Sequence, residues 1–293
     1  MRVTVSGGSG LIGSALVAAL RERGDEVTLL GRSDEGGATR WDPLEGPAPA
    51  AALSGRDAIV HLAGEPIAQR WTPRVREAIR DSRERGTANL VAGIEAAEPR
   101  PPVLVSASAV GYYGDRGDER LTEDSPPGED QLAQVCVAWQ AAAERARTLG
   151  VRVCTLRSGV VLDRRGGALA KMLPPFRLGV GGPVAGGRQY VAWIALEDLA
   201  GLYLAALDDE RYDGPLNATA PAPVRNAELS HALGRALHRP AVAPVPALAL
   251  RLLYGEMAQI VTASQNAVPA RALALGHTFA QPSLDGALAA ALS

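Results

Sequence analysis

The sequence predicts an α/β protein built on a doubly wound parallel sheet, with a smaller substrate lobe in its C-terminal half. Two observations lead to this fold class. Short apolar strands alternate with segments of helical periodicity along roughly the first 165 residues, and a glycine-rich turn joins the first strand to the first helix. Strands that alternate with helices pair in parallel, because each helix carries the chain back along a face of the sheet.

The first 30 residues form a strand–helix–strand unit. Residues 2–6 are short and β-branched, the apolar residues between 11 and 20 recur at helical spacing, and residues 26–30 form a second strand. Gly24 lies between the helix and the second strand, where glycine suits a left-handed C-terminal cap. We therefore expect two parallel strands with a right-handed crossover.

The alternation continues beyond this unit. The elements that follow are expected at residues 57–63 (strand), 73–85 and 87–97 (helices), 102–106 (strand), 131–149 (helix) and 151–156 (strand). The regular alternation of strand and helix patterns ends near residue 165. Glycine-rich loops follow, and then helices expected at residues 196–207, 226–237 and 247–254. This predicts a first domain at residues 1–165 and a mixed lobe at residues 166–293 that is intertwined with the sheet.

Composition and charge exclude several classes of protein. The chain of 293 residues has 30 basic and 32 acidic side chains, a net charge of −2, and 47% hydrophobic residues. It has no basic excess with which to neutralise a nucleic-acid backbone, and it is too apolar to be disordered throughout. It shows neither a secretory signal nor an apolar run of about 18 residues. Because Cys136 and Cys154 form no motif, we expect a reduced, cytoplasmic protein.

Three glycines at a spacing of three, Gly7, Gly10 and Gly13, lie between the first strand and the first helix. Glycine permits positive φ in the turn and lets backbone N–H groups approach a pyrophosphate, and the helix N-terminus adds about half a positive charge. This context favours a dinucleotide-binding (Rossmann) turn over an ordinary strand–helix turn. The residues expected to contact the phosphates are Gly7, Ser9, Gly10, Leu11, Ile12 and Gly13.

The end of the second strand distinguishes the two nicotinamide dinucleotides. NAD-binding proteins usually place Asp or Glu there, about 20 residues after the glycines, to bond the ribose 2′-hydroxyl. This chain has Gly31-Arg32-Ser33, with Arg32 19 residues after Gly13. A guanidinium binds a 2′-phosphate through paired N–H donors, whereas a carboxylate repels it. We expect NADP(H), held by Gly31, Arg32 and Ser33; the alternative is a solvated Arg32, with Asp34 in the NAD role.

Motifs spread over nearly the whole chain carry a family resemblance. Besides the glycine turn they include His61-Leu-Ala-Gly-Glu65, Ser106-Ala-Ser-Ala-Val-Gly-Tyr-Tyr-Gly114, Arg157-Ser-Gly-Val-Val-Leu162 and Gly255-Glu-Met-Ala258. With them the chain resembles the extended short-chain dehydrogenase/reductase superfamily, and within it an atypical branch of epimerase-family proteins of unassigned activity. The resemblance implies that residues 1–165 are an NADP-binding Rossmann domain and that residues from about 240 to 293 are the C-terminal segment of that branch.

The resemblance also shows a departure. In the superfamily a Tyr and a Lys four residues later share one helix face, where the lysine lowers the pKa of the tyrosine and the tyrosine transfers a proton. The one lysine of this chain, Lys171, has Gly167 four residues before it, so this pair is absent. Cys136 and Gln140 stand where the pair would fall.

Ser108 and Tyr113 are the catalytic candidates that the resemblance leaves. Ser108 lies just after a predicted strand, where a serine of the superfamily bonds a substrate oxygen. The hydroxyl of Tyr113, or of Tyr112, is expected to reach the nicotinamide. The alternatives are a serine that satisfies turn backbone and a tyrosine that only packs. Cys136 as an acid is a weaker hypothesis, because a thiol on an apolar helix face is usually inert.

Further contacts are expected at the ends of other strands. The cofactor contacts predicted there are Leu62, Ala63, Gly64, Ser106, Ala107, Gly159 and Val160, with Arg83 added by the resemblance. The resemblance implies that the region containing Lys171, Pro174, Phe176, Gln189 and Trp193 covers the substrate, although each of these residues also suits a structural role. Arg188 is one of several arginines that suit an anion. The four histidines lack metal-ligand spacing, so no metal is expected.

These patterns favour an NADP(H)-dependent oxidoreductase of unknown substrate that acts by hydride transfer. One alternative is a nucleotide-sugar epimerase or dehydratase, which the absent Tyr/Lys pair disfavours. The other is a non-catalytic NADP(H)-sensing module, which the same absence favours. We expect a small-molecule substrate and neither nucleic acid nor a membrane as partner, and a homodimer is left open.

Overall fold

A seven-stranded parallel sheet forms the centre of the protein in the computed structural model, which describes residues 1–34, 36–248, 250–252 and 255–293. Its strands are β1 (Arg2–Ser6), β2 (Glu26–Gly31), β3 (Thr39–Arg40), β4 (Ala58–His61), β5 (Val103–Ala109), β7 (Arg152–Ser158) and β11 (Gly214–Ala218). Their spatial order is β11-β7-β5-β4-β1-β2-β3, and every neighbouring pair is parallel. This confirms the predicted doubly wound fold.

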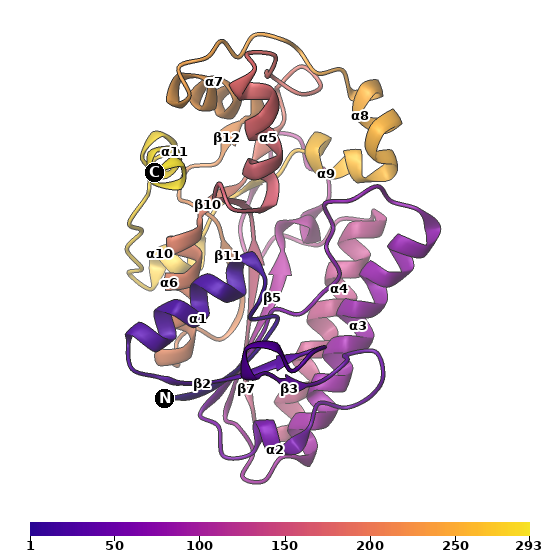
Figure 1. The fold of residues 1–293 in the computed structure, drawn as a ribbon, viewed down its shortest axis with the longest axis vertical. Coiled ribbons are helices and arrows are strands. Elements are labelled where there is room, and N and C mark those ends of the chain that lie inside the picture. The colour runs from indigo at the N-terminus through magenta and orange to yellow at the C-terminus, as the bar shows by residue number, and fades with distance from the viewer.

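Helices cover both faces of the sheet (Figure 1). On one face α1 (Leu11–Glu22) and α6 (Leu196–Asp208) pack on Val3, Val5 and Leu156. On the other face the helices are α2 (Ala50–Leu53), α3 (Pro73–Ala96) and α4 (Gln131–Glu144), continued by the 3-10 turn η3 (Arg145–Leu149). Consecutive strand residues point to opposite faces, so each strand that is buried on both sides contributes to both cores.

Helix α3 is continuous, whereas the sequence predicted two helices separated at Gly86. Thr72 caps its start by accepting a hydrogen bond from the N–H of Val75, and Pro73 occupies the first turn. Gly86 lies inside the helix, where a Cβ atom would stand 3.1 Å from that of Pro43. The glycine therefore serves close packing and does not end the helix.

The C-terminal lobe is a set of short elements. They are β8 (Val160–Leu162), α5 (Gly167–Arg177), β9 (Tyr190–Val191), β10 (Trp193–Ala195), β12 (Val224–Arg225), α7 (Asn226–Ala236), α8 (Ala247–Tyr254), η4 (Gly255–Met257), α9 (Ala258–Thr262), β13 (Asn266–Ala267), α10 (Ala270–Ala274) and α11 (Leu284–Leu292). Three more elements, η1 (Glu35–Gly37), η2 (Val110–Tyr113) and β6 (Arg120–Leu121), lie in the first half. Because α6 and β11 return to the central sheet after residue 165, the two parts share one core.

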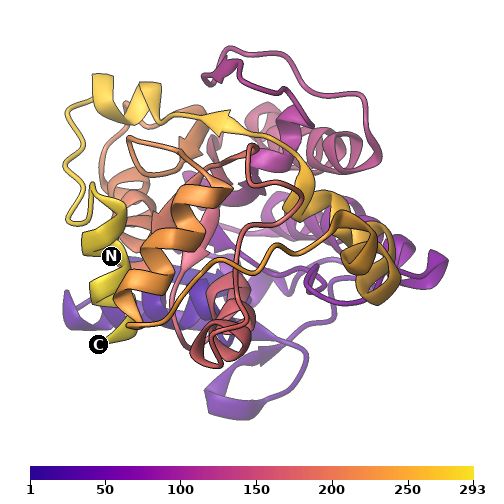
Figure 2. The same cartoon turned by 90° about the horizontal axis from the view of Figure 1, so that it is seen from above.

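The chain crosses the top of the molecule between α7 and α8, which lie on opposite sides in both ribbon views (Figures 1 and 2). Beyond this crossing it contacts the start of α3, where Arg76 pairs with Glu256 at 2.6 Å and Trp71 packs beside Met257. The described helices include none that is long and apolar enough to cross a membrane.

Candidate functional site

The glycine turn has the geometry of a phosphate cradle. Gly7 has φ +75°, and a Cβ atom on it would stand 2.7 Å from the backbone nitrogen of Ala63. A Cβ on Gly13 would stand 2.2 Å from the carbonyl oxygen of Gly7, so helix α1 and the turn pack as closely as their backbones allow. Gly10 begins the helix without a side-chain cap, which leaves Leu11, Ile12 and Gly13 to present their N–H groups to a ligand.

The end of β2 lies beside this turn, as predicted, since Ser6 and Leu30 pair in register. Arg32 and Ser33 follow the strand and are exposed. The structure adds a second arginine that sequence reasoning missed: Arg40 is exposed and pairs in register with Gly31. Its signal was faint, because β3 has only two residues.

The end of β4 supports the turn from the other side. The N–H of Leu62 donates to the carbonyl oxygen of Ser6 at 3.0 Å, and Gly7 lies against Leu62 and Ala63. Gly64 follows, and a Cβ atom on it would stand 3.6 Å from the guanidinium carbon of Arg83 on α3. The structure thus brings the predicted residues Leu62, Ala63, Gly64 and Arg83 together beside the glycine turn.

A buried polar layer lies directly beneath the turn. His61 contacts Ser6 Oγ at 2.7 Å through Nδ1 and Thr87 Oγ1 at 3.0 Å through Nε2. Burial lowers the pKa of His61 to about 4, so the ring is neutral. Ser106 belongs to the same layer, and it is fully buried and bonded to the carbonyl oxygen of Ala107. Its hydroxyl is therefore bonded within the sheet, and the cofactor contact expected at Ser106 stays a prediction.

A chain of buried hydrogen bonds starts at Ser108. Gln140 Nε2 donates to Ser108 Oγ at 2.9 Å, and Arg157 donates to Gln140 Oε1 from Nε at 3.3 Å and from Nη2 at 3.1 Å. The three side chains are 4%, 8% and 3% exposed, in the order Ser108, Gln140 and Arg157. A guanidinium only donates, so Gln140 must turn its oxygen to Arg157 and its nitrogen to Ser108. Since Ser108 Oγ accepts this bond, its own proton is available to another acceptor.

Two tyrosines hold Arg157 in turn. The guanidinium carbon of Arg157 lies 3.5 Å from the ring centroid of Tyr112, and its Nη1 donates to the Tyr113 hydroxyl at 2.9 Å. That hydroxyl also contacts Asn217 Oδ1 at 2.6 Å, and burial raises the pKa of Tyr113. Tyr113 is fully buried and all its polar contacts lie inside the protein. Its hydroxyl therefore supports Arg157. The sequence had predicted a different role, in which this hydroxyl reaches the nicotinamide.

Arg157 is the functional residue that sequence reasoning missed here. The available signal was an arginine directly after the apolar strand predicted at residues 151–156, because a charge at the end of a central strand needs polar partners. Cys136, one turn before Gln140, is buried, and desolvation raises the pKa of its thiol to about 11. Cys136 is thus an inert packing residue at neutral pH.

Of the remaining predicted residues, some follow the strand ends, some are exposed and some lie in the core. Gly159 and Val160 follow β7, and the N–H of Val160 donates to the carbonyl oxygen of Ala192 at 2.7 Å. Phe176, Gln189 and Trp193 are buried in the lobe, where Gln189 donates to the carbonyl oxygens of Val184 and Val261 and the indole N–H of Trp193 to that of Ala222. Lys171 and Pro174 of the predicted substrate region are exposed, and so is Arg188. Lys171 donates to the carbonyl oxygen of Ala68.

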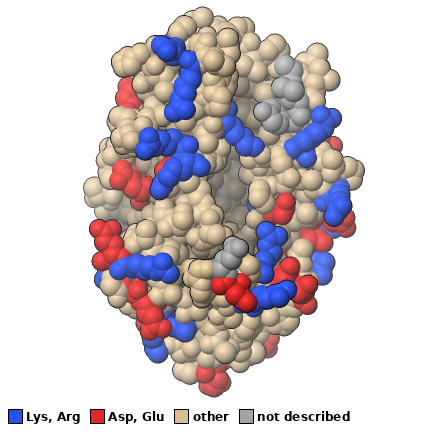
Figure 3. Space-filling model, viewed as in Figure 1, with Lys and Arg blue, Asp and Glu red and all other residues tan. Residues whose placement is uncertain are grey.

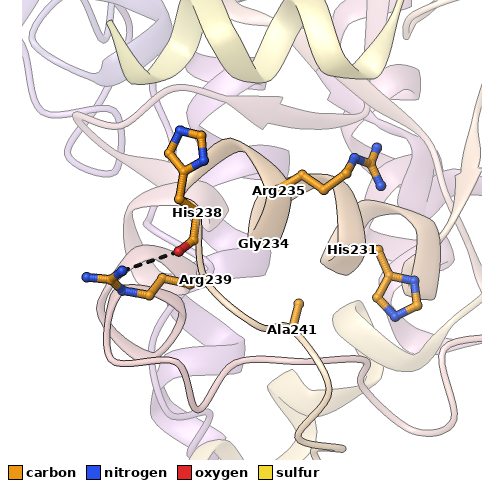
Figure 4. Close-up of a pocket in the computed structure, with 6 residues that line it drawn as sticks. All are labelled: His231, Gly234, Arg235, His238, Arg239 and Ala241. Carbon is orange, nitrogen blue, oxygen red and sulfur yellow. Dashed lines mark hydrogen bonds between the residues drawn. The ribbon is translucent and has the colours of Figure 1, made fainter.

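The face of the molecule is hollowed near its centre, over the carboxyl ends of the strands (Figures 1 and 3). Another hollow, of about 590 Å³, lies on the C-terminal lobe and is lined by His231, Gly234, Arg235, His238, Arg239 and Ala241 (Figure 4). It contains none of the predicted site residues. The described His, Cys, Asp and Glu side chains form no group of three or more that could hold a metal ion.

Comparison with known proteins agrees with this geometry. The model of the NAD dependent epimerase/dehydratase family matches residues 3–217, and a domain of unknown function, DUF1731, matches residues 245–291. A chloroplastic epimerase family protein SDR39U1 homolog of Arabidopsis thaliana is 41% identical, over 99% of this chain and 86% of the relative. An epimerase family protein of Mycobacterium bovis is 40% identical over 98% of this chain and 96% of its own length.

A solved structure extends the comparison. The crystal structure of human epimerase family protein SDR39U1 with NADPH has a TM-score of 0.92 and 38% identity, and the alignment covers 100% of both chains. The parallel sheet, the glycine turn and the matched length therefore lead to one conclusion: this chain belongs to the NAD-dependent epimerase/dehydratase family and carries the DUF1731 domain at its C-terminus.

Proposed function

We propose that the protein binds NADPH along the carboxyl edge of its sheet and reduces the carbonyl group of a small molecule. The hydrogen-bond chain from Arg157 through Gln140 carries this proposal, because it leaves the Ser108 proton free to bond a substrate oxygen. A hydroxyl held in this way is suited to an oxygen that gains negative charge during reduction.

The residues at the sheet edge fit the cofactor. The uncapped start of α1 and the glycine cradle suit the pyrophosphate, and the exposed Arg32 and Arg40 near the end of β2 suit a 2′-phosphate. The human relative, which shares 38% identity with this chain, was crystallised with NADPH. This supports NADPH as the cofactor of this chain as well. When bound, NADPH supplies a hydride; the chain's own residues bind it and orient the substrate oxygen.

The missing Tyr/Lys pair limits the reaction. Cys136 has a pKa of about 11 and is buried, and the Tyr113 hydroxyl is bonded within the protein, so neither replaces the absent tyrosine. Epimerases and dehydratases of this fold must move protons on the substrate, which needs such a group. Reduction also needs one proton, because hydride addition turns the carbonyl oxygen into an alkoxide. In this proposal the alkoxide takes the Ser108 proton, which water replaces, so the chain must supply only a fixed hydroxyl donor at that oxygen.

Turnover of NADPH against a library of aldehydes, ketones and quinones tests this proposal. We expect Ser108→Ala to lower kcat about a hundred- to a thousandfold, the usual effect of removing one oxyanion donor, while NADPH binding is retained. Gln140→Glu should act similarly, because a carboxylate accepts from Arg157 and draws the Ser108 proton toward itself. Gln134→Glu, on the exposed side of the same helix, is the matched control and should have no effect. Binding of NADPH without turnover of any carbonyl would overturn the reductase assignment.

A further inference from the structure

An exposed apolar surface lies on the C-terminal lobe. It is formed by the five most exposed large aliphatic side chains of the described residues, which are Leu178, Val180, Val242, Leu248 and Leu252. We call these five residues the distal patch. They are 59–78% exposed, whereas the next in this order, Leu273, is 44% exposed. Single exposed aliphatic residues are common in proteins, but a group of five indicates a surface that meets another apolar surface.

Three segments that lie together in the fold contribute the distal patch. The first follows α5, and the second is the chain that crosses from α7 to α8. These two segments run side by side, because the N–H of Ala243 donates to the carbonyl oxygen of Gly181 at 3.4 Å. The third segment is α8 itself, where Leu248 and Leu252 are one turn apart. Figure 1 shows α7, α8 and the crossing chain at the top of the molecule.

The crossing chain presents an apolar edge between the other two segments. Along residues 241–246 more exposed residues alternate with less exposed ones, and the more exposed row is Val242, Pro244 and Pro246. Consecutive residues of an extended chain point to opposite sides, so this row lies on one side and leads directly to Leu248 of α8. The distal patch is therefore a band across the lobe, not a set of scattered residues.

The charges of the segments around the distal patch have one sign. Residues 164–196 and 229–255 contain eight basic residues and no Asp or Glu, although acidic residues outnumber basic ones in the whole chain. Three of these cations adjoin the patch in sequence, namely Arg177, Arg239 and Arg251. All three are exposed, and none forms an ion pair with a described carboxylate. In Figure 3 Lys and Arg side chains predominate over the upper part of the visible face.

This combination of apolar side chains and positive charge indicates what covers the patch. A second copy related by a two-fold axis would place the same patch opposite itself, so that the arginines of the two copies would repel each other. An anionic lipid surface has both complementary properties, because its acyl chains accept Leu and Val and its headgroups pair with Arg. A lipid surface also adapts to side chains from three separate segments, whereas a folded protein partner must match their shape.

We propose that the distal patch docks the protein on an anionic lipid surface. The inference is independent of the proposed reduction, because it uses none of the residues at the cofactor edge. The sequence predicted no membrane partner, and its lack of a long apolar run argues only against a segment that spans the bilayer. A patch assembled from three short segments needs no such run, since it enters only the headgroup region.

Co-sedimentation with vesicles tests this proposal, with phosphatidylcholine alone and phosphatidylcholine mixed with phosphatidylserine as the two surfaces. The unaltered protein should bind the mixed vesicles, be released by added salt, and leave the neutral vesicles unbound. The double variant Leu248→Gln, Leu252→Gln should bind the mixed vesicles about tenfold more weakly, because two apolar side chains no longer enter the lipid. Arg177→Gln and Arg251→Gln should each weaken binding about fivefold.

Two variants outside the distal patch are the matched controls. Leu273→Gln on α10 and Arg21→Gln on α1 also replace exposed side chains, and both should bind the mixed vesicles normally. Circular dichroism checks that each variant folds like the unaltered protein, as expected for changes at exposed positions.

Three results would overturn the inference. Equal binding to neutral and anionic vesicles would remove the role of the arginines, and normal binding by the double variant would remove the role of the patch. Absence of binding to either vesicle would overturn the lipid surface itself. If light scattering then shows a dimer that the double variant loses, the patch belongs to a second copy of the chain; if the protein binds poly-glutamate instead, it belongs to an acidic protein partner.

Discussion

At the scale of single residues, His61 shows how the cofactor edge is supported from below. The ring is fully buried between Ser6 and Thr87, and both of its nitrogens have a partner. Desolvation lowers the pKa from 6.5 to about 4, because a charged ring would lose its hydration without gaining a carboxylate. The strand ends beneath the phosphate turn are therefore held together by a neutral imidazole.

This makes stability depend on pH in a predictable direction. Below a pH of about 6.5 the unfolded chain binds a proton at His61 that the folded protein does not, so unfolding becomes easier as pH falls toward 4. The slope for one proton is about 1.4 kcal/mol per pH unit, and above that window the group contributes nothing. His61→Gln keeps polar atoms near both hydroxyls and should flatten the dependence of the unfolding free energy between pH 6.5 and 4. Urea unfolding at several pH values measures this; the exposed His231→Gln should leave the slope unchanged.

The positions that the sequence predicts at the sheet edge are those that local backbone determines. Gly7, Gly13 and Arg32 are found where the strand–turn–helix pattern puts them. Arg157 was missed because its partner Gln140 is 17 residues away and the Tyr113 hydroxyl 44, and only the packing of α4 against β5 and β7 joins them. Such a network depends on helix rotation, which periodicity alone does not specify.

At the scale of elements, glycines inside helices explain where boundary prediction fails. An isolated glycine weakens a helix by about 1 kcal/mol relative to alanine, which is why Gly86 predicted a break. In the folded protein, close packing offsets that cost. Gly93, also in α3, would place a Cβ atom 2.4 Å from the carbonyl oxygen of Ala48, whereas Gly201 in α6 has nothing within 4 Å.

The same substitution should therefore have opposite effects in these two helices. Gly93→Ala forces α3 away from the backbone of Ala48 and should destabilise the protein by about 1–3 kcal/mol. Gly201→Ala only improves helix propensity and should stabilise it by up to about 1 kcal/mol. Chemical denaturation of both variants measures the difference. Equal shifts of the same sign would show that propensity, and not the Ala48 contact, determines the effect.

At the scale of the whole molecule, the C-terminal segment is part of the sheet's own hydrogen bonding. Glu123 accepts the N–H of Asn217 in β11, at 3.0 Å, and the N–H of Arg271, at 3.2 Å. The Asn217 amide donates in turn to the carbonyl oxygen of Val268 at 2.9 Å. The residues after 245 match a separate family model, yet their backbone bonds Glu123 of the first domain and Asn217 of the central sheet. The change of sequence pattern near residue 165 predicted the lobe. It did not predict that buried groups bond to the C-terminal segment, since Glu123 and Arg271 are about 150 positions apart in the chain.

Glu123→Gln tests whether the two parts unfold as one. It removes the charge and leaves one oxygen to accept from the N–H groups of Asn217 and Arg271, so the unfolding free energy should fall by about 1–3 kcal/mol. Because these bonds join the C-terminal segment to the sheet, the loss should move a single transition, seen alike by far-ultraviolet circular dichroism and tryptophan fluorescence. Glu119→Gln, in the same loop and paired with Arg116 at the surface, should change stability by less than about 0.5 kcal/mol. Two separate transitions, with only the first displaced by Glu123→Gln, would show instead that the C-terminal segment folds independently of the sheet.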